Sequence, residues 1–176
     1  MTRTPRIALA LTLAILIVGA DWALFHRDWM PLFWHLRHGR HAELNGVRFT
    51  VPLLYQEDHG ASTDMVEFYQ FPGRFSKKTA AITIQFNKSS SIPAFDSTFV
   101  VRERTASLAE KRGNCVEYVS PRYITVGEFS MLSNSAPTYI YCDFGNGWRA
   151  NFSGSLDAKY DFYAFLADAK LLSRRN

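Results

Sequence analysis

Apolar residues are distributed along this chain in two different ways. Residues 7–18 form one uncharged, apolar run near the N-terminus, whereas apolar and polar residues alternate in short stretches from Gly46 onward. A long apolar run is typical of a signal sequence or a membrane span, and alternation with a period of two is typical of strands with one buried face. The sequence therefore predicts a hydrophobic N-terminal segment followed by a body rich in β-structure.

The body contains several strand-like stretches that end at proline, glycine or polar loops. In the first, Val47, Phe49 and Val51 alternate with polar residues, and Pro52 closes the stretch. Such alternation places the apolar side chains on one face of a sheet. We expect further strands in residues 65–71, 80–86, 115–119 and 122–132, and in the segment TYIYCDFGNGWRANFSG.

That last segment predicts a β-hairpin whose register can be chosen from its apolar face. A two-residue Asn-Gly turn would set Phe144 beside Arg149, whereas a three-residue loop over 145–147 keeps one face apolar. We therefore predict the longer loop, built as a type I turn with Gly147 left-handed and a bulge. Six residues then share the apolar face: Ile140, Cys142, Phe144, Trp148, Ala150 and Phe152.

Two segments favour helices. The segment SLDAKYDFYAFLADAKLL begins with the N-cap candidates Ser155 and Asp157. Its apolar residues recur at helical spacing: Ala158, Phe162, Phe165, Leu166, Ala169 and Leu172. Residues 96–112 are ambiguous, because Asp96 and Gly113 suit a helix start and stop, while TFVVRERT is rich in β-forming residues. We favour a helix over 96–112 and keep a strand as the alternative.

The predicted fold class is α+β. It combines an antiparallel sheet of about six strands with a C-terminal helix and a mid-chain helix packed on it, preceded by an N-terminal transmembrane helix. The order of elements resembles that of PsbP/Mog1-like sandwich domains, over residues 45–172. The matching pieces are NGVRFTVPLLY, the mid-chain helix and WRANFSGSLDAKYDFYAFLADAKLL. The resemblance implies a binding or assembly module, often attached to a membrane, with no catalytic residues to carry over.

The N-terminal segment admits two interpretations. Arg3 and Arg6 precede the apolar run, and Val18 and Ala20 suit a signal-peptidase site, so cleavage after Ala20 would release a secreted protein. Alternatively, an uncleaved helix over 7–25 has 19 residues and approximately matches a membrane core of about 30 Å. We favour the anchor, with the N-terminus inside and the body outside the cytoplasm. The expected division is 1–25 anchor, 26–45 juxtamembrane segment and 46–176 extracytoplasmic domain.

The juxtamembrane segment is rich in aromatic and basic residues. This composition is typical of a membrane interface, and a short helix between Pro31 and Gly39 would lie in the headgroup plane. The residues expected at this interface are Trp22, Trp29, Trp34, Arg37 and His38.

Three histidines in this segment raise the alternative of a metal site. His35, His38 and His41 are spaced by three, but Gly39 interrupts the helix that would carry them. Zinc also requires a fourth ligand or a bound water. The interfacial role is therefore favoured, and the alternative is a metal-dependent factor or enzyme that uses this cluster, together with His59.

Charge and composition restrict the partners. Residues 1–45 hold five basic and three acidic side chains, and residues 46–176 hold fifteen and thirteen, so no basic face dominates the body. A nucleic-acid partner is therefore not expected. The expected partners are membrane lipid, through the N-terminal helix, and another membrane or periplasmic protein.

The remaining candidates lie in the predicted strands. Cys115 and Cys142 are the only cysteines, and in an exported protein two such cysteines usually pair; the bond would contribute roughly 3.5 kcal/mol. Tyr139, Tyr141 and Asp143 lie on the hairpin face opposite the core, where they contact a partner or are covered by a helix. No catalytic constellation and no cofactor motif is recognised, which favours a non-enzymatic function.

Overall fold

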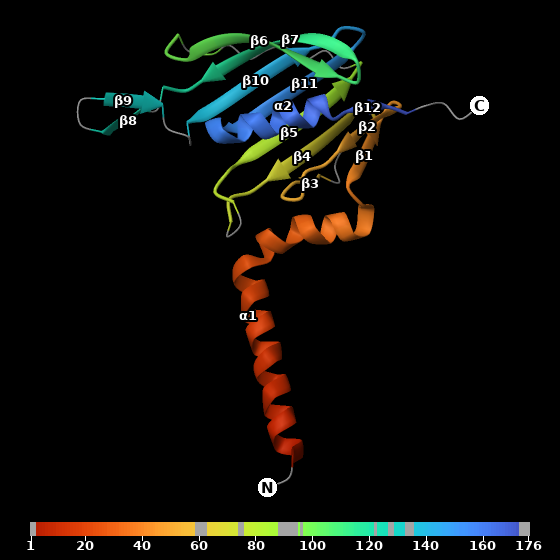
Figure 1. The fold of residues 1–176 in the computed structure, drawn as a ribbon, viewed down its shortest axis with the longest axis vertical. Coiled ribbons are helices and arrows are strands. Elements are labelled where there is room, and N and C mark those ends of the chain that lie inside the picture. Colours follow the sequence, from red (N-terminus) through yellow and green to blue (C-terminus); the bar gives the residue numbers. More distant parts are fainter. Residues whose placement is uncertain are drawn as a thin grey trace.

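The computed structural model describes residues 3–58, 63–73, 76–87, 95, 97–121, 123–126, 129–132 and 136–172. A long N-terminal helix, α1 (Arg3–His38), leads into a strand-rich body. A short helix, α2 (Lys159–Ala167), packs on the body after a 3-10 turn at Leu156–Ala158 (Figure 1). The α+β class is therefore as predicted.

Helix α1 is bent sharply in its second half. Its limbs Ile7–Ala23 and Asp28–His38 meet at 97°. The first limb extends away from the body, and the second crosses beneath it (Figure 1). Pro31 lies in the first turn of the second limb, where a missing N–H costs least. The helix ends before Gly39, whose positive φ of 77° allows its N–H to bond the carbonyl of His35, as the predicted stop requires.

A small sheet forms one side of the body. It has the order β1-β2-β12, with β1 at His41–Leu44, β2 at Val47–Thr50 and β12 at Lys170–Leu171. Asn45 and Gly46 both have positive φ, so they form the two-residue mirror-image turn that suits a hairpin. Strand β1 belongs to the segment expected beside the membrane, so the body begins earlier in the chain than Gly46.

The main sheet is antiparallel and has seven strands in the order β3-β4-β5-β11-β10-β7-β6. Their bounds are β3 Gln56–Glu57, β4 Met65–Gln70, β5 Ala80–Phe86, β6 Val100–Leu108, β7 Lys111–Val119, β10 Pro137–Asp143 and β11 Trp148–Ser155. Strands β8 (Tyr123–Val126) and β9 (Phe129–Leu132) pair only with each other among the described strands.

The hairpin β10–β11 has the predicted register. Asp143 pairs with Arg149, and the six residues of the apolar face are all buried. Gly147 has a φ of 81°, as predicted. The expected type I turn is wrong, because Asn146 also has a positive φ, of 49°, and the Trp148 N–H bonds the Gly145 carbonyl. The Asn-Gly pair thus forms a mirror-image turn, with Gly145 as the additional residue.

The predicted mid-chain helix over 96–112 is wrong. These residues include β6, which pairs with β7 along its whole length, and Asp96 lies outside the described residues. Ala109 and Glu110 have φ values of 46° and 71° and form the two-residue turn between the strands. The β-forming residues and the pairing to β7 outweigh the helix propensity of ASLAEKR, which is a weak preference.

Helix α2 connects the two sheets through aromatic packing. Phe165 lies 5.4 Å from Phe49 in the small sheet and 5.2 Å from Phe68 in the main sheet, between ring centroids. The predicted apolar stripe is buried from Ala158 to Ala169. The helix ends at Ala167, before Leu172, because the chain continues into β12, which pairs with β2.

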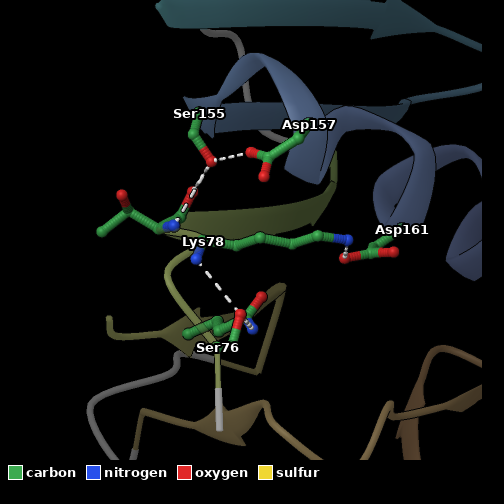
Figure 2. A network of polar contacts seen from close by, with 7 residues as sticks. Ser76, Lys78, Ser155, Asp157 and Asp161 are labelled. Atoms are coloured by element: carbon green, nitrogen blue, oxygen red, sulfur yellow. Dashed lines mark hydrogen bonds and ion pairs between the residues drawn. The ribbon is translucent and has the colours of Figure 1, made fainter. Parts of the chain in front are cut away.

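The start of α2 is attached to the main sheet by polar contacts (Figure 2). Ser155 precedes the 3-10 turn as predicted, but it makes no capping bond; its hydroxyl instead contacts Asp157. Lys78, just before β5, forms an ion pair of 2.9 Å with Asp161. These contacts fix α2 over one face of the sheet.

Candidate functional site

The main sheet has a second face that no described helix covers. The strand register arranges its outward side chains in rows across β7, β10 and β11. The rows are Tyr118–Tyr139–Ser153, Val116–Tyr141–Asn151 and Asn114–Asp143–Arg149. This surface, called the open face below, therefore carries the predicted contact residues Tyr139, Tyr141 and Asp143 together.

An aromatic cluster occupies one part of the open face. The ring of Phe95 stacks on Tyr118 with 4.2 Å between centroids and lies 5.3 Å from Tyr139. Tyr139 and Tyr141 are half-buried. The pKa of Tyr141 is raised, first by burial and then by the neighbouring phenols of Tyr139 and Tyr118, so its hydroxyl stays protonated and can donate a hydrogen bond. The ring of Phe95, rather than a described helix, shields these tyrosines.

Polar residues surround the uncovered part of this face. A hollow of about 320 Å³ lies around Tyr141, Asp143 and Arg149, and a neighbouring hollow of about 560 Å³ extends over β6 and β7. Both hollows are lined by Asn114 and Val116, so they form one shallow groove. Amide, carboxylate, guanidinium and phenol groups along such a groove can bind polar and main-chain groups of a partner.

The predicted disulfide lies directly beneath this groove. Cys115 and Cys142 are opposite each other on β7 and β10, with an S–S distance of 2.00 Å and 4.0 Å between their Cα atoms. Both are buried on the core side. The bond cross-links β7 and β10, two neighbouring strands of the open face, and disulfides of this kind persist in oxidising compartments.

A buried charge cluster lies on the opposite, core side of β7. Glu117 is 0% exposed and Lys159 is 2% exposed, with 2.9 Å between Oε2 and Nζ. Arg104 approaches the other carboxylate oxygen at 3.1 Å, and the Tyr163 hydroxyl donates to it at 2.8 Å. Burial raises the pKa of Tyr163, and the hydrogen bond to Glu117 raises it further. These groups satisfy one another's charges and hydrogen bonds.

Sequence reasoning missed this cluster, although the signal was present. In the stretch CVEYV, every second residue is buried: Cys115, Glu117 and Val119 all face the core. An acidic residue at an inward position requires a buried partner. Lys159 is 42 residues further along the chain, and no local pattern identifies it.

The three histidines of the proposed metal cluster lie in different environments. His35 is buried, with Nδ1 2.9 Å from the carbonyl oxygen of Gly39 and Nε2 3.0 Å from that of Pro52. The ring of His38 lies 5.2 Å from that of Trp34, between centroids, and His41 is exposed on β1. Within the described ranges, no three His, Cys, Asp or Glu residues are arranged to hold a metal ion. His59 lies outside the described residues.

The residues expected at a membrane interface are divided between two environments. Trp22 is exposed, and the indole N–H of Trp29 donates to Asp21 at 3.0 Å. Trp34 is only 6% exposed and packs toward the body. The exposed apolar side chains of the second limb are instead Met30, Phe33 and Leu36, the last 83% exposed. Arg37 and His38 line a cavity between this limb and the body.

The apolar N-terminal segment is a weak span candidate. In the part of the chain that the structure describes, no single helix is long and apolar enough to cross a membrane. The two limbs of α1 meet the criterion of length and composition only when taken together, as a bent pair.

No protein-family model matches this chain, and no curated protein matches it significantly. The resemblance to PsbP/Mog1-like sandwich domains therefore stays a prediction from the order of elements.

Proposed function

We propose that this chain is a membrane-anchored, extracytoplasmic binding module that acts without catalysis and contacts a membrane or periplasmic protein through its open face. The main support for membrane anchoring is the exposed apolar surface of the first limb of α1. Its apolar side chains, from Ile7 to Val18, are exposed on all sides and do not pack against the body. An apolar surface of this extent is stable only in contact with another apolar medium, and a bilayer supplies one.

The bend in α1 supports the same arrangement. A second limb at 97° to a spanning limb would lie parallel to the membrane surface, with Leu36 exposed on one side. Trp34 and His35 are buried on the other side and attach the limb to the body. The body would then stand on the membrane surface, in an oxidising compartment suited to its disulfide.

The open face supports the binding role. Tyrosine and arginine are enriched among residues that dominate binding energy, and Tyr141 and Arg149 adjoin the groove. The disulfide keeps strands β7 and β10 in a fixed arrangement before a partner arrives, which lowers the entropic cost of binding.

Fractionation of cells followed by intact-mass measurement tests the anchoring. The expected species is the full-length chain in the membrane fraction, with a mass gain of about 2 Da on reduction of one disulfide. A matched variant, Leu11→Arg with Ile15→Arg, should leave the membrane fraction because charges in the membrane core are costly. A soluble species that begins at Asp21 in the unaltered protein would overturn the proposal and identify a secreted protein.

A further inference from the structure

Strand β6 forms one edge of the main sheet, on the side of the body away from α1 (Figure 1). It has nine residues, pairs with β7 in an unbroken register and contains neither proline nor lysine. The opposite edge, β3, has only two residues and lies against the second limb of α1. Proteins usually shorten, cover or interrupt sheet edges, because an uncovered edge can pair with another chain. Among the described strands, none pairs with the outer side of β6.

The hydrogen-bonding phase of the sheet shows which backbone groups of β6 point outward. The turn at 109–110 has two residues, so the residues that flank it, Leu108 and Lys111, exchange both backbone hydrogen bonds. On the other side of β7, the N–H of Ser120 donates to the carbonyl of Pro137 at 2.8 Å. This bond directs the even-numbered residues of β7 to β10 and the odd-numbered ones to β6, which is the same phase. The even-numbered residues of β6 are therefore bonded to β7.

The residues between them direct their backbone N–H and C=O groups away from the sheet. They include Val101, Glu103 and Thr105, all of which are exposed. In register these residues lie across from the β7 residues of the open face, so their side chains are on that face. Glu103 and Thr105 line its hollow of about 560 Å³. A strand that pairs with β6 would therefore place every second side chain at the margin of the open face.

The alternate side chains of β6 lie on the side of the sheet that α2 covers, and they add positive charge there. Arg104 and Lys159 share the buried carboxylate of Glu117, at 3.1 and 2.9 Å. Arg102 is across from Glu117 in register and is exposed, and no ion pair within the described residues involves it. Three cations thus accompany one carboxylate at this edge. An acidic side chain on an added strand would be stabilised beside Arg102, because opposite charges across neighbouring strands attract.

The same charges disfavour a second copy of this chain as the added strand. A two-fold axis at Glu103 would set two Glu103 side chains opposite each other and Arg102 opposite Arg104. An axis at Arg104 would set two Arg104 side chains opposite each other. Like charges directly opposite each other are destabilising. A strand from another protein, with acidic residues, matches the edge better.

We propose that the β6 edge binds an extended acidic segment of the partner protein as an eighth strand of the main sheet. The backbone groups of Val101, Glu103 and Thr105 would form hydrogen bonds with the segment. Acidic side chains at alternate positions of the segment would lie beside Arg102 and Arg104. The inference rests on the proposed binding role of the open face and identifies the kind of segment that binds at its margin.

Peptide binding to the full-length chain tests the inference. The probes are two synthetic peptides as long as β6, in which threonine alternates with glutamate in one and with lysine in the other. At low salt the glutamate peptide should bind about tenfold more tightly than the lysine peptide, and added salt should reduce the difference. Arg102→Gln should remove most of this difference. Arg48→Gln, at an exposed ion pair of the small sheet, is the matched control and should retain it.

Two further measurements locate the bound peptide. Hydrogen exchange should slow at the backbone N–H groups of Val101, Glu103 and Thr105, and it should change little at Arg104, which is already bonded to β7. Thr105→Pro removes an outward N–H without removing a bond to β7, so Thr105→Val, which keeps the N–H, should bind the glutamate peptide about tenfold more tightly than Thr105→Pro. Hydrogen exchange requires no variant and decides the question even if the proline variant does not fold.

The outcomes separate this inference from the proposed function. No binding of the glutamate peptide, equal affinity for the two peptides at low salt, or slowed exchange confined to β10 and β11 overturns the edge site. A dimer of the chain that slows exchange at the same three N–H groups overturns the choice of occupant. A chain that binds the glutamate peptide as expected but is absent from the membrane fraction contradicts only the anchoring. A chain that is anchored and does not bind the peptide contradicts only this inference.

Discussion

Glu117 and Lys159 form an ion pair of 2.9 Å in which both side chains are almost completely removed from solvent. The pair joins strand β7, next to the sheet edge, to the first residue of α2. Breaking a buried pair by removing one partner leaves an uncompensated charge, which costs several kcal/mol.

The first prediction concerns this pair. Lys159→Met should lower the free energy of unfolding by about 3 kcal/mol, because Glu117 keeps only Arg104 and Tyr163 as partners. Urea unfolding measures the change. Lys170→Met, at an exposed position on β12, is the control and should change stability little. Equal effects in the two variants would show that the buried pair contributes no specific stability.

The second prediction concerns Tyr55, which is 1% exposed and whose hydroxyl has no hydrogen-bond partner within the described residues. Tyr55→Phe removes a buried, unsatisfied polar group and should stabilise the fold by about 1 kcal/mol. Tyr163→Phe is the contrasting variant, because the hydroxyl of Tyr163 donates to Glu117, and its loss should destabilise. A loss of stability in Tyr55→Phe would mean that the hydroxyl has a bound partner.

The same residue makes stability depend on alkaline pH. Burial, and then the charges of Asp161 and Asp157, raise the pKa of the Tyr55 phenol above its ordinary value. In the unfolded chain tyrosine loses its proton near pH 10. The contribution of the neutral phenol is therefore complete below about pH 10 and declines at higher pH. Thermal unfolding between pH 8 and pH 11 should show a smaller alkaline loss for Tyr55→Phe than for the unaltered protein.

The third prediction uses the turn between β6 and β7. Glu110 has a φ of 71°, which residues other than glycine adopt at a cost of roughly 1–2 kcal/mol. Glu110→Gly should therefore raise stability by about 1 kcal/mol. Glu103→Gly, the same substitution inside β6, should lower stability by about 0.5–1 kcal/mol. Thermal unfolding distinguishes the two, and a loss of stability in both would argue against this turn.

The pairing of β6 with β7 also explains why residues 96–112 do not form the predicted helix. Asp96 and Gly113 resemble helix boundaries, but Gly113 lies within β7, where an added Cβ would come within 2.4 Å of the Phe144 ring. Glycine is needed at position 113 because two strands approach closely there, and it does not mark a helix end. The pairing of β6 with β7 depends on residues on both sides of the turn, and a local propensity does not report it.

Other elements were predictable because their signals are local and redundant. The hairpin β10–β11 followed from the requirement for one apolar face, and the disulfide followed from two cysteines in strands. The Asn-Gly pair at 45–46 is an equally clear turn signal, and both residues have the positive φ of such a turn. The cavity beside Arg37 depends instead on the bend of α1, which no hydrophobic pattern specifies.

The fourth prediction concerns the disulfide. Replacing both Cys115 and Cys142 by alanine should lower the free energy of unfolding by roughly 3–4 kcal/mol, because the closed loop restricts the unfolded chain. Reductant should destabilise the unaltered protein to a similar extent and leave the double variant unchanged. A reductant effect that persists in the double variant would have to arise elsewhere.

The fifth prediction tests the open face in cells. A photo-crosslinking residue placed at Asp143, beside the groove, should form a covalent adduct with a membrane or periplasmic protein. The same residue placed at Tyr160, which is exposed on α2 at the opposite side of the sheet, should not form that adduct. Arg149→Ala in the Asp143 variant should weaken the adduct, because Arg149 lines the same groove. Adducts of equal yield at both positions would mean that α2, or the whole surface, makes the contact and that the open face has no special role.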